Sequence, residues 1–478
     1  MEPNVFYPPG SGSSGWTRPS QWRQMPTPSA EEMDCLLAIT NDDSNYVAFT
    51  ITGGAYYVDW GDGNGNIPYG SGATAYGPQQ NVTFTNGSAS IGWPGATELA
   101  AGQIVRFLTT GVLPSGFAIN TNYFVSATGL SATTFQLAAT NGGTPIVAGS
   151  AGSGTQTALV TYDFATFDPS NLTLTTAGYK QAIVKVTPQS GQHITGINFQ
   201  VKHPILATSS AYSPQWLDIA INCGNCTSLA VGGLTVTCSW VQRVNVLSIG
   251  GITNFSYMFA SCYSLQSVPL FNTAAGTNFS NMFYYCYSIQ SVPLFNTAAG
   301  TNFSGMFYQC LSLQSVPLFN TAAGTNFSYM FASCSSLQSV PLFNTAAGTN
   351  FSGMFYQCLS LQSVPLFNTA AGTNFSSMFQ GCSSLQSVPL FNTAAGTIFS
   401  NMFYYCSSLA EGALSGTTYA ISYSGCKLSE AALVAIFTAL GSANGGSQTI
   451  TVTGTWGDAL LTAADKAIAT GKGWTVAT

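Results

Sequence analysis

The sequence predicts a protein of mixed β and α/β class, in which an N-terminal β-sandwich precedes a solenoid of short repeats and an α/β C-terminal cap. Three observations support this prediction. Eight cysteines recur at one interval of 24 residues between Cys238 and Cys406, and the string SVPLFNTAAGT occurs six times in that region. Alternating apolar residues precede the repeats, and a helix-like segment follows them. A short fixed period is typical of a solenoid, because one unit alone cannot bury its apolar face.

Residues 1–35 are rich in proline and show no apolar periodicity. Such a segment does not fold by itself, but aromatic and arginine side chains are common anchors in protein interfaces. The candidate anchors are Trp16, Arg18, Trp22 and Arg23. We expect a docking arm that holds the chain to another subunit of an assembly. A disordered tail is the alternative interpretation.

The next region contains strand patterns around the string VDWGDG at residues 58–63. This string, together with VTYDF and GYKQAIVKVTP further along the chain, resembles the PKD-like β-sandwich module. The resemblance implies one sandwich that is split by an insertion, which exposed loops tolerate well. We expect three parts here: the first part of the sandwich at 36–82, a small inserted β-domain at 83–157 and the second part of the sandwich at 158–204.

Four oxygen-bearing residues near this turn have the alternate spacing of calcium ligands: Asp59, Asp62, Asn64 and Asn66. An EF-hand loop would add a glutamate at its twelfth position, which this sequence lacks, and Asp and Gly are ordinary turn residues. We therefore expect a turn and no cofactor, and a calcium site is the alternative.

Each repeat combines two apolar patterns. Phe255, Met258, Phe259 and Cys262 have the spacing of one helix face, which predicts a short helix. Residues 265–270, with the sequence LQSVPL, predict a short strand, followed by a turn in TAAGT. One helix and one strand per 24 residues predict a leucine-rich-repeat solenoid at residues 205–426, with residues 238–255 as a degenerate first unit.

The repeat motif MFxxCxSLxSVP resembles the BspA-like leucine-rich repeats of bacterial and phage surface proteins. The resemblance implies a right-handed solenoid that binds partners and performs no chemistry. The ordered strings GWTRPSQW, YVDWGDG, YKQAIVKVTPQSG, SPQWLDIAI and GKGWTV are similar to those of phage-encoded BspA-like proteins as whole chains. That similarity implies a virion surface protein, such as a tail fibre or a surface decoration.

The repeated cysteines predict an inward ladder of buried free thiols, because equivalent atoms of stacked strands lie about 4.8 Å apart. Chained disulfides are the alternative. Cys223 and Cys226 form a CxxC motif, but the chain has only His193 and His203 as further soft ligands and no second CxxC. We therefore assign this motif to the start of the solenoid and not to a zinc site.

Residues 427–478 predict an α/β cap that closes the solenoid. Ser429 is a helix N-cap, Gly441 ends the helix, and the apolar stripe between them is Leu433, Ile436, Phe437 and Leu440. The strings QTITVTG and GWTV predict strands around a second helix near residues 463–469.

Charged residues make up 5% of the chain, and none lies between Arg243 and Glu411. The net charge of -6 provides no basic surface, so nucleic acid is not an expected partner. No run of 18 apolar residues occurs, and the first residues lack the features of a secretion signal. These observations favour a protein made in the host cytoplasm that reaches the outside on a virion, after host lysis.

Catalysis requires a proton carrier, an activated nucleophile or a metal. The repeats contain no such carrier. The pairs Asp59 with Asp62 and Asp163 with Asp168 are near in sequence only, and solvated turns explain them. We therefore expect no enzyme and no catalytic residues.

Tyrosines are concentrated where the repeat copies differ, beside the apolar positions. We expect these to be exposed, and a tyrosine offers a flat apolar ring and a hydroxyl at low entropic cost. The candidate ligand-binding residues are Tyr257, Tyr263, Tyr284, Tyr285, Tyr287, Tyr308, Tyr329, Tyr356, Tyr404 and Tyr405. The alternative is drift at unconstrained surface positions. The constant Asn and Thr of FNTAAGT predict polar ladders that serve the turns.

The leading hypothesis is a phage virion structural protein that displays the solenoid to bind a host cell-surface glycan or protein. The N-terminal region would contact other virion proteins, and a homo-oligomer is possible. The alternatives are a bacterial surface adhesin of the BspA type and a virion scaffold without receptor binding.

Overall fold

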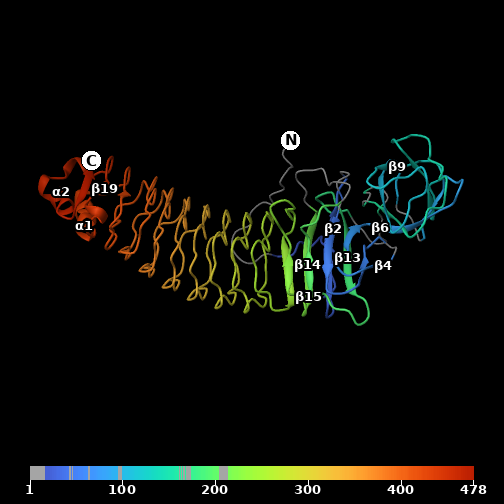
Figure 1. Ribbon diagram of the computed structural model, residues 1–478, viewed down its shortest axis with the longest axis horizontal. Helices are drawn as coiled ribbons and strands as arrows, with labels where there is room; N and C mark the ends of the chain where they lie inside the picture. Colours follow the sequence, from blue (N-terminus) through green and yellow to red (C-terminus); the bar gives the residue numbers. More distant parts are fainter. Residues whose placement is uncertain are drawn as a thin grey trace. The chain divides into compact units, whose positions relative to one another are not determined.

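The computed structural model describes residues 17–41, 45, 47–62, 65–94, 99–160, 162, 164, 167, 174–203 and 214–478 (Figure 1). The chain forms two compact units, Met1–Gly250 and Gly251–Thr478. The first unit is built from three β-sheets, and the second contains the repeats and the C-terminal helices. The described residues are mostly β, with a few helices near the C-terminus, so the predicted mixed β and α/β class is confirmed in its β part.

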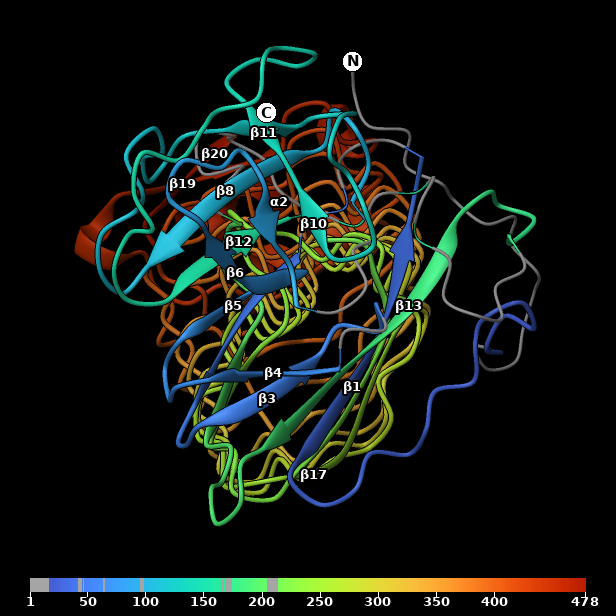
Figure 2. The same cartoon turned by 90° about the vertical axis from the view of Figure 1, so that its right-hand side faces the viewer.

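The first sheet has six strands in the order β17-β15-β1-β13-β3-β4 (Figure 2). The central strand β1 lies antiparallel to β13 on one side and to β15 on the other, while β15 and β17 are parallel. The strand bounds are β1 Glu32–Ile39, β3 Tyr56–Asp59, β4 Asn66–Tyr69, β13 Lys180–Pro188, β15 Trp216–Cys223 and β17 Arg243–Ile249. Residues predicted as solenoid from position 205 therefore begin in a sheet shared with β1, because β15 bonds to both β1 and β17.

A second sheet of four strands packs on the first. Its order is β16-β14-β2-β5, with bounds Ser228–Ala230, Gly196–Asn198, Val47–Thr52 and Thr74–Gly77. The ring of Phe49 on β2 lies 6.4 Å from that of Trp216 on β15, and both rings contact Phe199. Two sheets thus share one aromatic core, as in a sandwich. The likeness of this sandwich to the PKD-like module stays a prediction.

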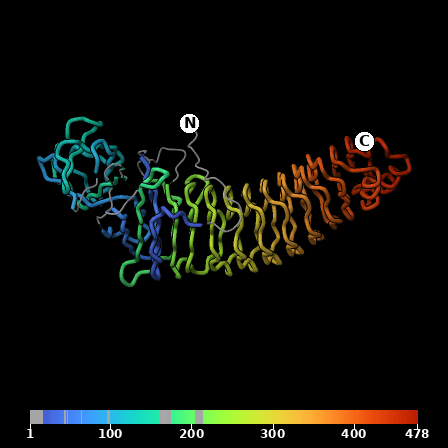
Figure 3. The backbone as a smooth tube through the Cα atoms, turned by 180° about the vertical axis from the view of Figure 1, so that it is seen from behind, coloured from blue at the N-terminus to red at the C-terminus, as the bar shows by residue number. Residues whose placement is uncertain are grey.

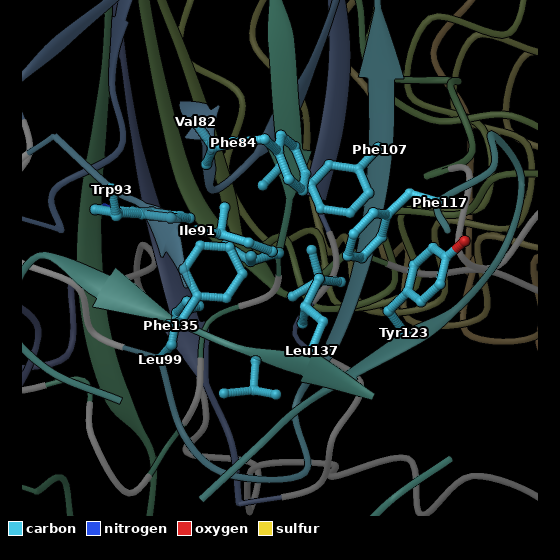
Figure 4. Close-up of a cluster of buried hydrophobic side chains, with 14 of the residues drawn as sticks. Val82, Phe84, Ile91, Trp93, Leu99, Phe107, Phe117, Tyr123, Phe135 and Leu137 are labelled. Carbon is cyan, nitrogen blue, oxygen red and sulfur yellow. The ribbon is translucent and has the colours of Figure 1, made fainter. Parts of the chain in front are cut away.

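A third sheet lies between the two halves of that sandwich in sequence. Its seven strands have the order β10-β7-β6-β12-β8-β9-β11. The bounds are β6 Gln79–Phe84, β7 Ile91–Gly92, β8 Ile104–Thr109, β9 Tyr123–Val125, β10 Thr134–Phe135, β11 Leu137–Ala138 and β12 Gln156–Leu159. Figure 4 shows its own buried cluster, in which Phe107 and Phe117 pack with ring centroids 5.6 Å apart.

The second unit begins with successive 24-residue turns of the chain, here called rungs, which follow one another as stacked loops (Figure 3). Parallel bridges join equivalent asparagines of neighbouring rungs, such as Asn278 to Asn302 and Asn302 to Asn326. The Asn and Thr of FNTAAGT serve the turns and join the rungs, as expected. Asn320 Oδ1 accepts from the Ala322 amide at 3.2 Å, and Thr321 Oγ1 donates to the Asn344 carbonyl of the next rung.

The helix predicted at Phe255, Met258, Phe259 and Cys262 is wrong. The equivalent segment of every rung, such as residues 303–310, is a series of turns that we call the turn segment. Its amides bond alternately in two directions. Met306 N–H donates to the carbonyl three residues earlier, while Gly305 and Phe307 donate to the following rung at 2.8 and 2.9 Å.

Left-handed backbone explains why no helix forms. The φ angle is 58° at Gly305 and 56° at Gln309, and equivalent residues of the other rungs have similar values. A positive φ reverses the chain after each turn and prevents a second helical turn. The apolar side chains at Phe303, Met306 and Phe307 nevertheless all point inward, because the turns bring them to the same side.

The predicted strand also differs from the prediction. Residues 313–318 and their equivalents in the other copies of the SVPLFNTAAGT string form no regular strand. Gln314 N–H donates to the Gln290 carbonyl of the preceding rung at 3.1 Å, but Pro317 has no N–H to offer. A proline at this point interrupts a continuous ladder in every copy, so no regular strand forms there.

The rung interior is filled by ladders of phenylalanine and cysteine. Phe307 stacks on Phe331 of the next rung with ring centroids 5.6 Å apart, and on Phe319 of its own rung at 6.2 Å. All twelve cysteines are buried and free. The predicted inward ladder of free thiols is confirmed.

The C-terminal region has the predicted two helices, α1 Glu430–Ala439 and α2 Ala463–Thr470. Ser429 caps α1 by accepting from the Ala432 amide, and Leu433, Ile436 and Phe437 are buried. Short 3-10 turns lie at Asn444–Gly446 and Asp458–Leu460, and a parallel sheet consists of β18 Ile421–Ser422, β19 Gln448–Thr451 and β20 Trp474–Ala477. Tyr423 stacks on Phe403 at 4.9 Å, so this region continues the aromatic core of the last rung.

Candidate functional site

The turn segments place tyrosines side by side on the outside of the solenoid. In one rung Phe307 and Cys310 point inward, and Tyr308 between them lies at the surface, half-buried. Since every rung has the same backbone, tyrosines of neighbouring rungs come within ring contact. We define the tyrosine belt as eight of these residues: Tyr257, Tyr263, Tyr284, Tyr285, Tyr287, Tyr308, Tyr329 and Tyr356.

Ring contacts run through the whole belt. Two pairs are stacked between rungs: Tyr284 with Tyr308 at 4.9 Å and Tyr263 with Tyr287 at 5.0 Å. Tyr284 also lies 4.1 Å from Tyr285. The remaining contacts are Tyr285–Tyr287 at 5.8 Å, Tyr285–Tyr308 at 5.9 Å, Tyr257–Tyr284 at 6.3 Å, Tyr308–Tyr329 at 6.4 Å and Tyr329–Tyr356 at 6.4 Å. The belt is therefore one connected aromatic surface.

A shallow groove of about 710 Å³ lies along this surface. It is lined by aromatic rings and by small polar groups: Asn281, Tyr284, Ser304, Gly305, Tyr308, Ser328, Tyr329, Tyr356, Ser377 and Gln380. No charged side chain is among these lining residues. The groove therefore offers flat apolar faces, hydroxyls and amides to a neutral ligand.

Two phenols of the groove, those of Tyr284 and Tyr308, have raised pKa values. Burial raises the pKa of Tyr284 above its usual value, and a hydrogen bond with Tyr285 raises it further. Burial also raises the pKa of Tyr308. Both hydroxyls thus keep their protons and serve as donors as well as acceptors.

Exposure within the belt varies. Tyr257 and Tyr329 are exposed, at 37% and 42%, while the other members are half-buried because they stack on one another. Tyr404 and Tyr405 form a separate pair with ring centroids 4.1 Å apart. The structure thus brings eight of the ten predicted tyrosines together.

The polar lining of the groove is not evident from the sequence. Ser304, Ser328 and Gln380 lie beside the tyrosines only because neighbouring rungs are stacked in register. These residues recur at fixed distances from the cysteines, and this spacing could have indicated that they lie together. A small polar residue in a repeat, however, does not by itself indicate a ligand.

One variable position of the repeat has a structural explanation. It is occupied by Tyr257, Asn281, Gly305, Tyr329, Gly353, Ser377 and Asn401, and each has a φ between 54° and 58°. Gly and Asn adopt this left-handed conformation at low cost. The variation there thus occurs under a backbone constraint, which neither surface drift nor ligand binding would impose.

The N-terminal anchors have roles within the chain. Trp22 is 4% exposed and donates from Nε1 to the Tyr179 hydroxyl at 2.9 Å. Arg18 forms an ion pair with Asp218 at 3.1 Å, and Arg23 bonds to Gln181. These contacts hold residues 18–23 against the six-stranded sheet.

Trp22 and Arg18 are thus both used inside the first unit. Trp16 lies outside the described residues. Docking of this region to another protein stays a prediction.

In the candidate calcium turn, the side chain of Asp59 bonds to the backbone. Asp59 Oδ1 accepts from the Gly61 amide at 2.9 Å, which is ordinary turn chemistry. Asn64, Asp163 and Asp168 lie outside the described residues. Within the described ranges, no group of three or more His, Cys, Asp or Glu side chains is placed to hold a metal ion.

The two thiols of the CxxC motif are free and buried, like the thiols of the repeats. Cys226 Sγ donates to the Ser228 carbonyl at 3.0 Å, and burial raises the pKa of this thiol to about 11. A thiol of this kind remains protonated and unreactive. As for membranes, none of the helices in the described part of the chain has the length and apolar character that a bilayer span requires.

Comparisons with known proteins address the repeat region. Residues 235–341 and 325–415 match the family model described as "Mycoplasma protein of unknown function, DUF285". A comparison with curated proteins found no match. Among solved structures, a leucine-rich cell surface protein from Faecalibacterium prausnitzii matches at 17% identity, over 53% of this chain and 82% of that chain, with a TM-score of 0.22. The repeats of this chain are therefore similar to those of the DUF285 family, and they form a solenoid.

Proposed function

We propose that this chain is a phage virion structural protein, in a tail fibre or a surface decoration, whose solenoid binds a host cell-surface glycan through the tyrosine belt. The observation that supports this most is the uncharged groove that crosses neighbouring rungs along the belt. The protein acts by adhesion and not by catalysis.

The chemistry of the groove fits a neutral glycan. The C–H faces of a sugar ring pack on flat aromatic rings, and sugar hydroxyls exchange hydrogen bonds with hydroxyl and amide groups. Tyr308 and Tyr329 provide the rings, while Ser328 and Gln380 provide neutral donors and acceptors. A charged ligand would find no ion-pair partner among the residues that line the groove.

The virion location has different support. The ordered strings outside the repeats resemble phage-encoded proteins, and an uncharged repeat surface suits a part that is built into an assembly. The alternatives are a bacterial surface adhesin with the same groove and a virion scaffold that binds no receptor.

A glycan array with the purified full chain tests the adhesion proposal. The test variant combines Tyr284→Ala with Tyr308→Ala, which removes the stacked pair at the groove. The matched control combines Tyr404→Ala with Tyr405→Ala, which removes a tyrosine pair away from the belt. We expect at least tenfold weaker binding for the first variant only, a loss of about 1.4 kcal/mol.

Equal unfolding midpoints for the two variants would exclude a folding defect as the cause. Binding that survives in the Tyr284 and Tyr308 variant would contradict the belt as the site. A chain that binds no glycan and no host cell would favour the scaffold alternative.

The location is tested separately by immunogold labelling of phage particles with an antibody to the chain. Label on virions supports the proposal. Label on uninfected bacteria but not on particles would favour the bacterial adhesin.

A further inference from the structure

A stripe of exposed leucines runs along the solenoid, one per rung. The leucine of each PLF string is between 56% and 62% exposed, and a contiguous exposed apolar patch is typical of an interaction site. We define the leucine stripe as these six residues: Leu270, Leu294, Leu318, Leu342, Leu366 and Leu390. Equivalent atoms of stacked rungs lie about 4.8 Å apart, so the leucines form a continuous apolar row.

The stripe lies on the other side of the rung interior from the tyrosine belt. Leu318 is exposed, and the chain turns at this residue, because the Phe319 N–H donates to the Pro317 carbonyl at 2.9 Å. The next residue, Phe319, points inward and contacts Phe307 of the turn segment at 6.2 Å. Phe307 precedes Tyr308, which belongs to the belt. A partner on the leucine stripe would therefore leave the belt open.

The surroundings of the stripe are polar and uncharged. Each rung adds a glutamine, a serine and an asparagine, which are at least partly exposed, such as Gln314, Ser315 and Asn320 around Leu318. These four residues on each of six rungs match the 20 to 30 residues per side of a standard interface, which buries roughly 800 Å² per partner. The row is therefore long enough for a specific protein interface.

We propose that the leucine stripe pairs with the leucine stripe of a second copy of this chain. Two copies have the same rung spacing, so the leucines of one fit between those of the other along the whole row. No Asp, Glu, Lys, Arg or His lies between Arg243 and Glu411, so two such surfaces meet without like-charge repulsion. An identical patch on both partners is the usual form of a two-fold dimer interface.

Pairing of this kind places two tyrosine belts in one dimer. Two linked belts bind a polymeric ligand more tightly than one belt, without any new contact. The pairing itself depends only on the stripe, so it stands or fails independently of glycan binding.

Sedimentation velocity and light scattering of the full chain, from about 1 to 100 µM, test this inference. The test variant combines Leu318→Gln with Leu342→Gln at the centre of the stripe. The matched control combines Leu311→Gln with Leu359→Gln, two leucines 38% and 49% exposed that follow the repeat cysteines. We expect wild-type dimers, a dissociation constant at least tenfold higher for the stripe variant, and wild-type association for the control.

A second measurement does not depend on the stability of the glutamine variant. The single change Leu342→Cys places an accessible thiol on the stripe, and mild oxidation should link two chains covalently. The same change at Leu311 should give no linked dimer. A wild-type chain that stays monomeric throughout, or a stripe variant that associates like wild type, would overturn the inference. So would a monomeric chain that binds neutral liposomes through the stripe.

Discussion

The Sγ atom of Cys310 donates to the main-chain carbonyl of Phe283 in the preceding rung, at 3.2 Å. The Cys286 amide donates to the same carbonyl at 3.0 Å. Corresponding thiol bonds of 3.0 or 3.1 Å start from Cys286, Cys334, Cys358, Cys382 and Cys406. Each cysteine therefore fills the interior of its own rung and also bonds to its neighbour.

Replacement of one central thiol should destabilise the repeats. Cys334→Ala leaves a small cavity beside Phe331 and removes the bond to the Phe307 carbonyl, so we expect a loss of about 1 to 2 kcal/mol in the free energy of unfolding. Denaturant unfolding followed by circular dichroism measures it. Gln338→Ala, an exposed change in the same rung, is the control. Identical midpoints for both variants would contradict a structural role of the thiol.

The twelve thiols should not react in the folded protein. Burial raises the pKa of Cys238 to about 12 and that of Cys226 to about 11, and it shields the sulfurs from reagents. Alkylation followed by mass spectrometry should find twelve modified cysteines in denaturant and none in native buffer at pH 8. Gln338→Cys, which adds one exposed thiol, should gain a single label. A native mass lower by pairs of hydrogens would instead indicate disulfides.

Residues with a positive φ in the rungs should tolerate some side chains and be destabilised by others. Asn401 has a φ of 56°, and a β-branched residue is strained there. We expect Asn401→Val to cost about 1 to 2 kcal/mol in unfolding free energy, while Asn401→Gly is neutral or mildly stabilising. Thermal unfolding of the two variants gives the comparison. Equal melting temperatures would argue against the turn geometry of the rungs.

Asp34 should make stability fall as pH rises. Neither carboxylate oxygen has a hydrogen-bond partner among the described residues, and burial raises its pKa to about 6, with Lys185 lowering it and Glu32 raising it. The folded state thus holds this proton up to about pH 6, whereas the unfolded chain releases it near its ordinary value of 3.8. Stability from this group is therefore lost between about pH 4 and pH 6.

Asp34→Asn removes that loss. We expect the variant to be more stable than wild type at pH 7 by about 1 to 2 kcal/mol, because the solvent near the sheet reduces the full effect. The difference should vanish at pH 4. Urea unfolding at both pH values is the measurement. If the free energy of unfolding changes equally with pH in the two proteins, the raised pKa of Asp34 is contradicted.

The repeat could be predicted from sequence as a solenoid but not in its local geometry. The spacing of Phe303, Met306, Phe307 and Cys310 places four side chains on one side of either a helix or a series of turns, so periodicity cannot distinguish the two. The distinguishing signal lies at Gly305, Asn281 and Asn401, which are poor helix formers at a left-handed position. The C-terminal helix α1 was predictable because Ser429 and its apolar stripe are local signals.

The tyrosines of the candidate site could be predicted from the sequence, but not how far their ring contacts continue along the solenoid. The 24-residue period places Tyr284 and Tyr308 one above the other, so their stacking follows from sequence. The link from Tyr308 to Tyr329 joins different positions of two rungs, and it depends on how the turns aim each ring. The ion pair of Arg18 with Asp218 joins residues 200 positions apart, and no local pattern indicates it.

The bonding of each rung to its two neighbours has an evolutionary consequence. The amino-acid sequence of residues 305–328 is identical to that of residues 353–376. Recombination between these copies would delete or add two rungs, and every remaining rung would still meet a neighbour that it already fits. The gene can thus lengthen or shorten the display without a change in the interior, and the reach of the molecule can change while its fold persists.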